Sequence, residues 1–261
     1  MSVLAWDLFY VEAPLSVPNH LVSRGVQAYH AGIAMHNSNG TSLAFEYDAA
    51  NGVDKAVVPL MVNNTLVWHN EGVVVSDWNR SYWKRASLQA RLSDATVHEL
   101  LAYIHQYNVS IPRQGAGRGA PYYQPFQVVN ATTGDIRVRS MTCGDFGLDL
   151  LAYAAKLGVS IAPLLPTRKT VPLLYSTVPL EIVADDDPAL LEFWSTANKI
   201  VRMANVTSAM EAAAVLVGDV KRRQVAYMRL NGSNMRVKLV PPHCSWEYQE
   251  VQMNPTGAQS R

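Results

Sequence analysis

The stretch that decides the fold is residues 26–47, with the sequence VQAYHAGIAMHNSNGTSLAFEY. Its first half alternates between two faces as a strand does, residues 37–40 are strong turn formers, and the residues after the turn predict the returning strand of a hairpin. We place the centre of the turn near residue 38, which sets His30 directly opposite Glu46. Directly opposite residues point to the same face of a sheet, so we expect these side chains to be neighbours. A slip of one residue would separate them.

The segments that follow the hairpin predict strands and then a helix. Valine-rich residues at 56–68 and at 72–76 are typical of strands. Ser93 can cap a helix over about 95–107, in which four apolar residues share one face: Val97, Leu100, Leu101 and Ile104. The Gly- and Pro-rich residues 113–125 predict a surface loop, because a phosphate-binding loop would need a helix after it.

The second half of the chain predicts helices and then strands. Residues 143–157 carry a helical apolar stripe, with Thr142 as the N-cap and Gly158 just past the end. Further helices are expected from 187 to 204 and from 207, and strands return over 225–251. This order, without internal repeats or linkers, predicts an α+β fold in which an antiparallel sheet packs against helices, as a single domain over residues 1–261.

The composition excludes several classes of protein. Charged residues make up 16% of the chain, against roughly 25% in an average globular protein, and the formal net charge is +1. A near-neutral balance gives no electrostatic footprint for nucleic acid, and no cluster of basic residues marks a membrane-surface patch. No apolar stretch approaches the roughly 18 residues of a membrane-spanning helix. We therefore expect no nucleic-acid partner and no transmembrane segment.

Neutral polar residues replace the missing charge, and glycosylation sequons are over-represented among them. Asn-X-Ser/Thr occurs seven times, whereas about two occurrences are expected by chance. The seven asparagines are Asn39, Asn63, Asn79, Asn108, Asn130, Asn205 and Asn231. They predict a glycoprotein of the secretory pathway. The first residues lack the features of a signal peptide, so we expect that a signal has been removed; the alternative is a cytosolic protein.

Cys143 has the clearest chemical potential, because it stands at the expected start of a helix. The N–H groups and the dipole of a helix N-terminus favour a thiolate and can bind an oxyanion. His30 is a candidate general base for this cysteine, and Glu46 is a candidate to orient the imidazole. Two alternatives stay open: Cys143 as a small buried hydrophobic residue, and His30 as a hydrogen-bonded strand histidine.

Other chemistries have little support in the sequence. The remaining histidines show no metal-ligand spacing with cysteine, so we expect no metal site. No G-x-S-x-G elbow supports a serine hydrolase, and no cofactor signature is present. Asn70 is a weaker site candidate, as an orienting amide or an oxyanion donor. The two cysteines, Cys143 and Cys244, are too few for a scaffold built on disulfides.

Four stretches together resemble one known family. They are His30-Ala-Gly-Ile-Ala-Met, Glu46-Tyr47, Trp68-His69-Asn70-Glu71-Gly72 and Cys143-Gly144-Asp145-Phe146. Weaker similarities, such as Tyr122-Tyr123, extend the resemblance to roughly residues 5–255. The chain resembles the family of the lysosomal glycoprotein whose loss causes the type-five form of neuronal ceroid lipofuscinosis. That family looks papain-like, of the permuted sort related to bacterial NlpC/P60 enzymes, with the histidine before the cysteine.

The resemblance implies an activity and roles for individual residues. Cys143 would be the nucleophile, His30 the general base and acid, and Glu46 the orienting carboxylate. The activity would be that of a transacylase that forms bis(monoacylglycero)phosphate from lysophosphatidylglycerol, with thioesterase action on S-palmitoyl groups also attributed to the family. The substrate would then be a lysophospholipid or an acyl thioester, met in peripheral contact with luminal membranes. The alternatives are a cysteine palmitoyl-protein thioesterase or a peptidase on the same scaffold, and a non-catalytic luminal trafficking protein.

One departure from the family concerns the cysteines. The family includes a member with several disulfides, whereas this chain has two cysteines. A nucleophilic Cys143 must stay free, so Cys244 is expected to be unpaired as well. The low charge also leaves few carboxylates to protonate, and we expect the fold to survive at the acidic pH of a lysosome.

Overall fold

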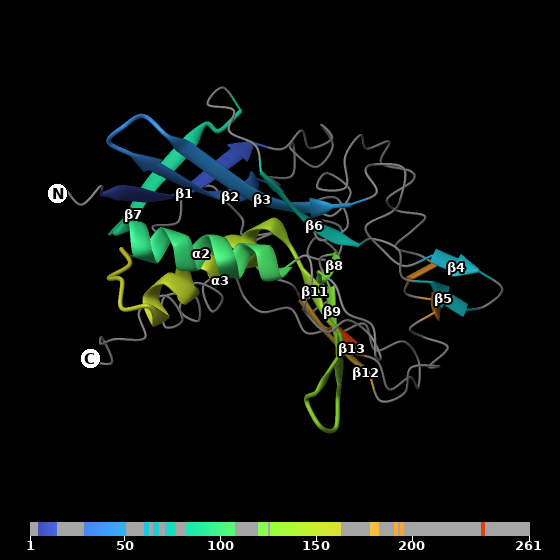
Figure 1. The fold of residues 1–261 in the computed structure, drawn as a ribbon. Coiled ribbons are helices and arrows are strands. Elements are labelled where there is room, and N and C mark those ends of the chain that lie inside the picture. The colour runs from blue at the N-terminus through green and yellow to red at the C-terminus, as the bar shows by residue number, and fades with distance from the viewer. Residues whose placement is uncertain are drawn as a thin grey trace.

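A five-stranded sheet with the order β6-β3-β2-β1-β7 is the largest element of the computed structural model (Figure 1). Every pair of neighbouring strands in it is antiparallel. Its strands are β1 (Trp6–Pro14), β2 (Tyr29–Asn37), β3 (Ser42–Ala49), β6 (Gly72–Ser76) and β7 (Arg85–Leu92). The structure describes residues 5–14, 29–50, 60–62, 65–67, 71–76, 82–107, 120–124, 126–162, 178–182, 191–192, 194–195 and 236–237.

The β2–β3 hairpin is confirmed, but its turn lies one residue later than expected. Asn37 Oδ1 accepts two backbone N–H groups of the turn, and Gly40 has the positive φ of 86° that glycine adopts without steric cost. The strand pairing sets Gly32 opposite Glu46, so the predicted register, with His30 opposite Glu46, was wrong by two residues. Because side chains alternate with a period of two, this error leaves both residues on the same face of the sheet.

Strand β1 lies between β2 and β7, and the sequence patterns did not predict it. It pairs antiparallel with both neighbours, with one irregularity between Leu8 and Phe9 on the β7 side. Residues 10–13 are buried in succession instead of alternating between buried and exposed. A strand without clean alternation lacks the main signal by which a half-buried strand is recognised.

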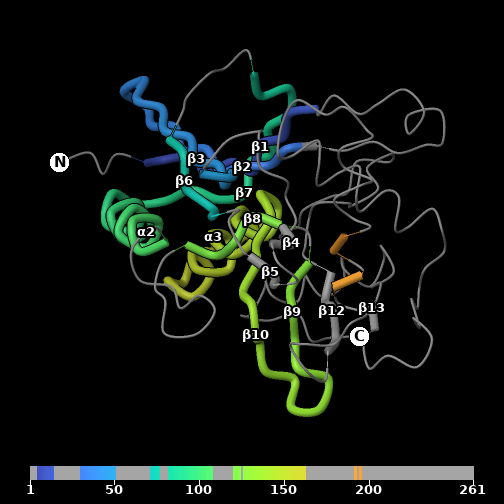
Figure 2. Tube along the Cα trace, turned by 90° about the vertical axis from the view of Figure 1, so that its right-hand side faces the viewer, coloured from blue at the N-terminus to red at the C-terminus, as the bar shows by residue number. Residues whose placement is uncertain are grey.

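Helices α2 (Asp94–Tyr107) and α3 (Cys143–Lys156) lie side by side against one face of the five-stranded sheet, as Figures 1 and 2 show. Three of the four apolar residues expected on the inner face of α2 are buried, and Leu101 is only partly buried. Helix α3 contacts both β2 and β3. Helix α3 is therefore packed directly against the hairpin.

Smaller sheets complete the described structure. One has the order β10-β9-β12-β13, in which β9 and β12 are parallel and the other pairs are antiparallel. Its strands are β9 (Phe126–Asn130), β10 (Ile136–Val138), β12 (Val178–Ile182) and β13 (Arg236–Val237). Two short pairs are β8 (Tyr122–Tyr123) with β11 (Ser140–Met141), which is parallel, and β4 (Leu60–Val62) with β5 (Thr65–Val67), which is antiparallel. The expected antiparallel sheet packed against helices is thus confirmed, while the papain-like relationship and the single domain over 1–261 stay predictions.

Several predictions fall outside the described residues. They concern Asn70, Cys244, the sequons at Asn63, Asn79, Asn108, Asn205 and Asn231, and the helix expected from residue 207. Of the helix expected over 187–204, residues 191–192 and 194–195 are described and helical. Within the described ranges, no helix is long and apolar enough to cross a membrane. The same ranges hold no group of three His, Cys, Asp or Glu side chains suited to a metal ion.

Candidate active site

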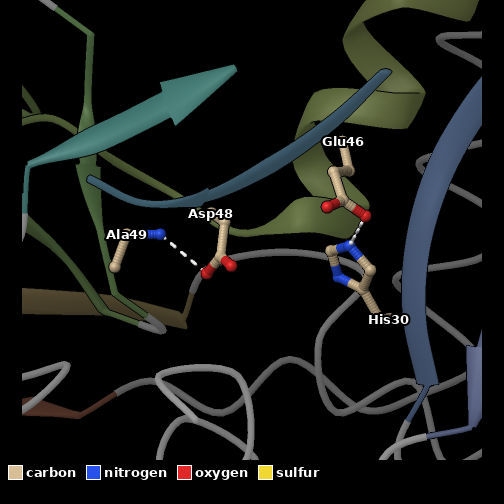
Figure 3. Close-up of polar contacts among 4 residues, drawn as sticks. All are labelled: His30, Glu46, Asp48 and Ala49. Atoms are coloured by element: carbon tan, nitrogen blue, oxygen red, sulfur yellow. Dashed lines mark hydrogen bonds and ion pairs between the residues drawn. The ribbon is translucent and has the colours of Figure 1, made fainter. Parts of the chain in front are cut away.

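The β2–β3 hairpin brings His30 and Glu46 into direct contact. Nε2 of His30 and Oε2 of Glu46 are 2.7 Å apart (Figure 3). The imidazole is fully buried, and the Glu46 side chain retains 18% exposure. The contact predicted from the hairpin is therefore confirmed, although Glu46 reaches His30 diagonally and not from the opposite position.

This contact fixes the role of each imidazole nitrogen. A carboxylate can only accept a hydrogen bond, so Nε2 carries the proton and donates it to Glu46. Nδ1 of His30 is buried and is the ring nitrogen left for the interaction with Cys143. In the neutral ring, Nδ1 holds the lone pair that can accept a proton from another group.

Cys143 enters the site as the first residue of α3. Thr142 is the N-cap: its hydroxyl accepts a hydrogen bond from the Asp145 N–H, and the Asp145 carboxylate accepts one from the Thr142 N–H. This reciprocal capping box fixes the first turn of the helix. Cys143 is fully buried and its thiol is free. The expected N-cap is confirmed, and so is Gly158, which follows the helix with a φ of 87°.

The electrostatics of the site favour a protonated imidazole. Burial by itself would lower the pKa of His30, but the negative charge of a Cys143 thiolate and the interactions with Glu46 outweigh burial and raise this pKa from 6.5 to about 10. His30 and Cys143 therefore lie close enough for a strong charge interaction. A proton that leaves the thiol has a stable position on the ring, between a thiolate and a carboxylate.

A second carboxylate, Asp48, lies two residues along β3 from Glu46. Its carboxylate accepts a hydrogen bond from the Ala49 N–H at 2.7 Å (Figure 3). Burial raises the pKa of Asp48, while this hydrogen bond and the charge of His30 oppose the increase. Asp48 adds negative potential near the imidazole without a direct hydrogen bond to it, which makes it a natural comparison for Glu46.

Two aromatic side chains cover the imidazole. The Trp83 indole stacks on His30 with a centroid distance of 5.6 Å and an interplanar angle of 19°. The Tyr82 ring is tilted against His30 at 6.1 Å. Burial and the negative charges of Glu46 and Cys143 raise the pKa of Tyr82, so this phenol stays neutral.

Tyr123 places a buried hydroxyl close to Cys143. It lies on β8, which pairs with the strand β11 that leads into Thr142. Its side chain is fully buried. Burial raises the pKa of Tyr123 well above its usual value, and the charge of a Cys143 thiolate and a hydrogen bond with it add to this effect. The phenol therefore remains a neutral donor next to the Cys143 sulfur.

Part of this arrangement was predictable from the sequence. His30, Glu46 and Cys143 come together, and their catalytic roles stay predictions. Of the described sequons, Asn39 is exposed in the β2–β3 turn, and the Asn130 side chain accepts two backbone N–H groups of the following turn.

The sequence did not predict Asp48, Tyr82 or Trp83 as parts of the site. Tyr123 entered only through the weaker similarity of Tyr122-Tyr123 to the family. The Tyr82-Trp83 pair gave no signal of its place, because it comes from a segment more than fifty residues beyond His30 in the chain.

Comparisons with known proteins add a relationship. No protein-family model matches the chain. Three similar proteins come from Dictyostelium discoideum. Cln5-like protein 1 is 29% identical over 146 residues, which is 53% of this chain and 36% of that protein. Cln5-like protein 2 is 26% identical over 200 residues, 70% of this chain and 58% of that protein. A ceroid-lipofuscinosis neuronal protein 5 homolog is 24% identical over 170 residues, 59% of this chain and 50% of that protein. The chain spans between about a third and three fifths of these curated relatives, and the similarities support a relationship with the Cln5 proteins.

Proposed function

We propose that this chain is a thiol-dependent acyltransferase in which Cys143 is the nucleophile, His30 the general base and acid, and Glu46 the orienting carboxylate. One observation carries the proposal. The buried His30 donates Nε2–H to Glu46 at 2.7 Å, which leaves Nδ1 as the acceptor in a ring that interacts with the thiol at the start of α3. A nucleophile, a base and an orienting group in this order are the elements of nucleophilic catalysis.

The proposed reaction proceeds through a thioester. Nδ1 of His30 takes the thiol proton, and the Cys143 sulfur attacks the acyl carbonyl of the donor. The carbonyl oxygen becomes an oxyanion, for which the N–H groups at the start of α3 and the Tyr123 hydroxyl are the proposed donors. The intermediate collapses when the C–O or C–S bond to the leaving group breaks. The imidazolium protonates that leaving group.

A second half-reaction would return the enzyme to its starting state. A hydroxyl of the acceptor gives its proton to Nδ1 of His30 as its oxygen attacks the thioester. The C–S bond then breaks, an ester forms, and Cys143 regains its proton from the imidazolium. Glu46 keeps the proton on Nε2 throughout and stabilises the imidazolium that forms in each half-reaction.

The substrate and the cellular setting rest on the resemblance to the type-five ceroid lipofuscinosis glycoprotein family. It suggests lysophosphatidylglycerol as acyl donor and acceptor, bis(monoacylglycero)phosphate as product, and a papain-like, permuted NlpC/P60 type of fold. The Cln5 names of the similar proteins support the same family. The seven sequons support a glycoprotein of the lysosome or secretory pathway. Peripheral contact with luminal membranes would follow from the lipid substrate.

A second candidate function is a non-catalytic luminal protein. The full burial of Cys143 and His30 favours it, because a substrate carbonyl must reach the sulfur. Hydrolysis of acyl thioesters or peptides on the same scaffold is the remaining alternative. It differs from transfer only in that water takes the place of the acceptor hydroxyl.

The test compares three substrates with matched variants. Purified protein receives lysophosphatidylglycerol in vesicles, a palmitoyl thioester, or a peptide, and mass spectrometry follows both the products and the acyl adduct on Cys143. We expect transfer to a second lipid, which Cys143→Ser and His30→Gln abolish. His36→Gln serves as the control, because His36 lies on the same strand and instead contacts Ser42. Wild-type transfer by the Cys143→Ser variant would refute the proposal, and failure of any acyl probe to label Cys143 would favour the non-catalytic candidate.

A further inference from the structure

The Trp83 indole reaches His30 from a distant strand. Trp83 lies two residues before β7, whereas His30 lies on β2, and β1 separates these strands in the sheet. The backbone next to Trp83 is anchored, because the Lys84 N–H donates to the Glu12 carbonyl at 2.9 Å. The indole thus lies across the end of β1 and stacks on the imidazole at 5.6 Å.

Gly32 provides the space for this stacking. A Cβ atom at this position would lie 2.9 Å from Cη2 of Trp83 and 2.8 Å from the Phe45 carbonyl oxygen. The absence of a side chain on β2, two residues from His30, therefore lets the indole approach. The indole N–H is buried and has no hydrogen-bond partner among the described residues. Packing against His30, Gly32 and the buried cluster of Val11, Ala34 and Ala44 therefore sets the position of the ring.

We propose that Trp83 is a positioning residue, which holds the charged imidazolium of His30 against its aromatic face and so keeps Nδ1 directed at Cys143. This inference rests on the proposed acid–base role of His30. A cation within about 6 Å of a Trp ring is attracted by the electron-rich face, and the attraction grows when water is excluded. The stacking also restricts rotation of the imidazole out of the plane in which it meets both partners.

The contribution of Trp83 to the environment of His30 differs from that of the charged and titratable groups around the imidazole. Glu46 and Asp48 face it from β3, Cys143 from α3, and Tyr82 from the segment before β7. Tyr82 packs edge-on against Trp83 at 4.9 Å and is 38% exposed, so it forms the outer part of the cover. Among these neighbours, Trp83 is the one that presents a stacked face to the ring without titrating itself.

The experiment compares Trp83→Phe with Trp83→Leu. Both variants keep an apolar side chain over His30, but only the phenylalanine variant retains an aromatic face. NMR of the His30 ring protons follows a titration through the pKa of about 10, and the pH dependence of acyl transfer is measured on the same proteins. We expect Trp83→Leu to lower the pKa of His30 by roughly one unit and to shift the alkaline limb of the rate profile with it. Trp83→Phe should stay close to wild type.

A replacement variant and a separate activity measurement complete the test. If Trp83→Leu does not fold, Trp83→Met, whose flexible apolar side chain also lacks an aromatic face, takes its place and should shift the His30 titration in the same direction. Equal His30 titrations for wild type, Trp83→Phe and Trp83→Leu would overturn the inference, as would a shift of the same size in both variants. The NMR readout does not depend on catalysis, so a fully active Cys143→Ser variant would remove the proposed function and leave the effect of Trp83 on His30 measurable.

Discussion

The contact between Glu46 and His30 allows a sharp prediction for Glu46→Gln. Glutamine has the same shape and can still accept Nε2–H, but it carries no charge. A hydrogen bond to a charged partner contributes about 1.5–3 kcal/mol and a neutral one about 0.5–1.5 kcal/mol. The difference of about 1–2 kcal/mol corresponds to roughly one pH unit. Because Glu46 interactions raise the pKa of His30, their loss should lower it by about that amount.

The same variant should slow the chemistry more than the pKa alone requires. The amide can also turn its NH2 group toward Nε2, which would place the ring proton on Nδ1 and remove the base that faces Cys143. Loss of the correct tautomer in a catalytic triad can cost up to ~10⁴-fold in rate. We therefore expect single-turnover acylation of Cys143, followed by mass spectrometry, to fall by at least roughly tenfold.

Asp48→Asn is the matched control for Glu46→Gln. Asp48 carries the same charge on the same strand, but it bonds to the Ala49 N–H and not to the imidazole. Its replacement should lower the pKa of His30 less than Glu46→Gln does and leave the tautomer unchanged. If both variants give the same His30 titration by NMR and the same acylation rate, the hydrogen bond between His30 and Glu46 does not orient the base and the reasoning fails.

Three other predictions follow from single contacts. Tyr123→Phe removes a buried hydroxyl next to Cys143, so kcat should fall by roughly 10–10³-fold with little change in KM. Tyr107→Phe should leave both constants unchanged, and equal kinetics for the two variants would contradict an oxyanion role for Tyr123. Thr142→Val removes the cap of α3 and should cost about 1–2 kcal/mol in chemical denaturation, as should Ser93→Ala at the start of α2, but only the former should slow acylation of Cys143. Burial raises the pKa of Asp48 and Asp149 above 3.8. Their ionised forms therefore lower the stability of the fold above the raised pKa, and protonation in acid removes this effect. The melting temperature at pH 5 should be no lower than at neutral pH, and a sharply lower value in acid would contradict this reasoning.

The local half of the site could be predicted because a hairpin is a local structure. The turn residues around Gly40 and the alternation on both strands placed His30 and Glu46 on one face, even though the turn centre was misplaced by one residue. An error of two in register preserves the face, and side chains as long as glutamate bridge the diagonal. The helix start at Cys143 was also accessible, because Thr142 and Gly158 are strong local signals for its two ends.

The remaining features depend on how strands pair at long range. Strand β1 has no alternating pattern over its buried residues 10–13, so neither its place in the sheet nor its separation of β2 from β7 could be foreseen. Trp83 reaches His30 only because of that strand order, and Tyr123 reaches Cys143 only because β8 pairs with β11. Such contacts are selected by the packing of the whole domain, for which one sequence offers no periodic signal.

The spacing of the three candidate residues along the chain has a consequence during synthesis on the ribosome. His30 and Glu46 are sixteen residues apart, and their hairpin can close early because short loops cost little entropy. Cys143 follows almost a hundred residues later, and its helix start is capped by residues on both sides of it. The emerging chain therefore holds the imidazole and the carboxylate without the thiol, and Cys143 meets His30 only when α3 docks on the hairpin. Under the proposed function, acquisition of reactivity would be coupled to completion of the fold.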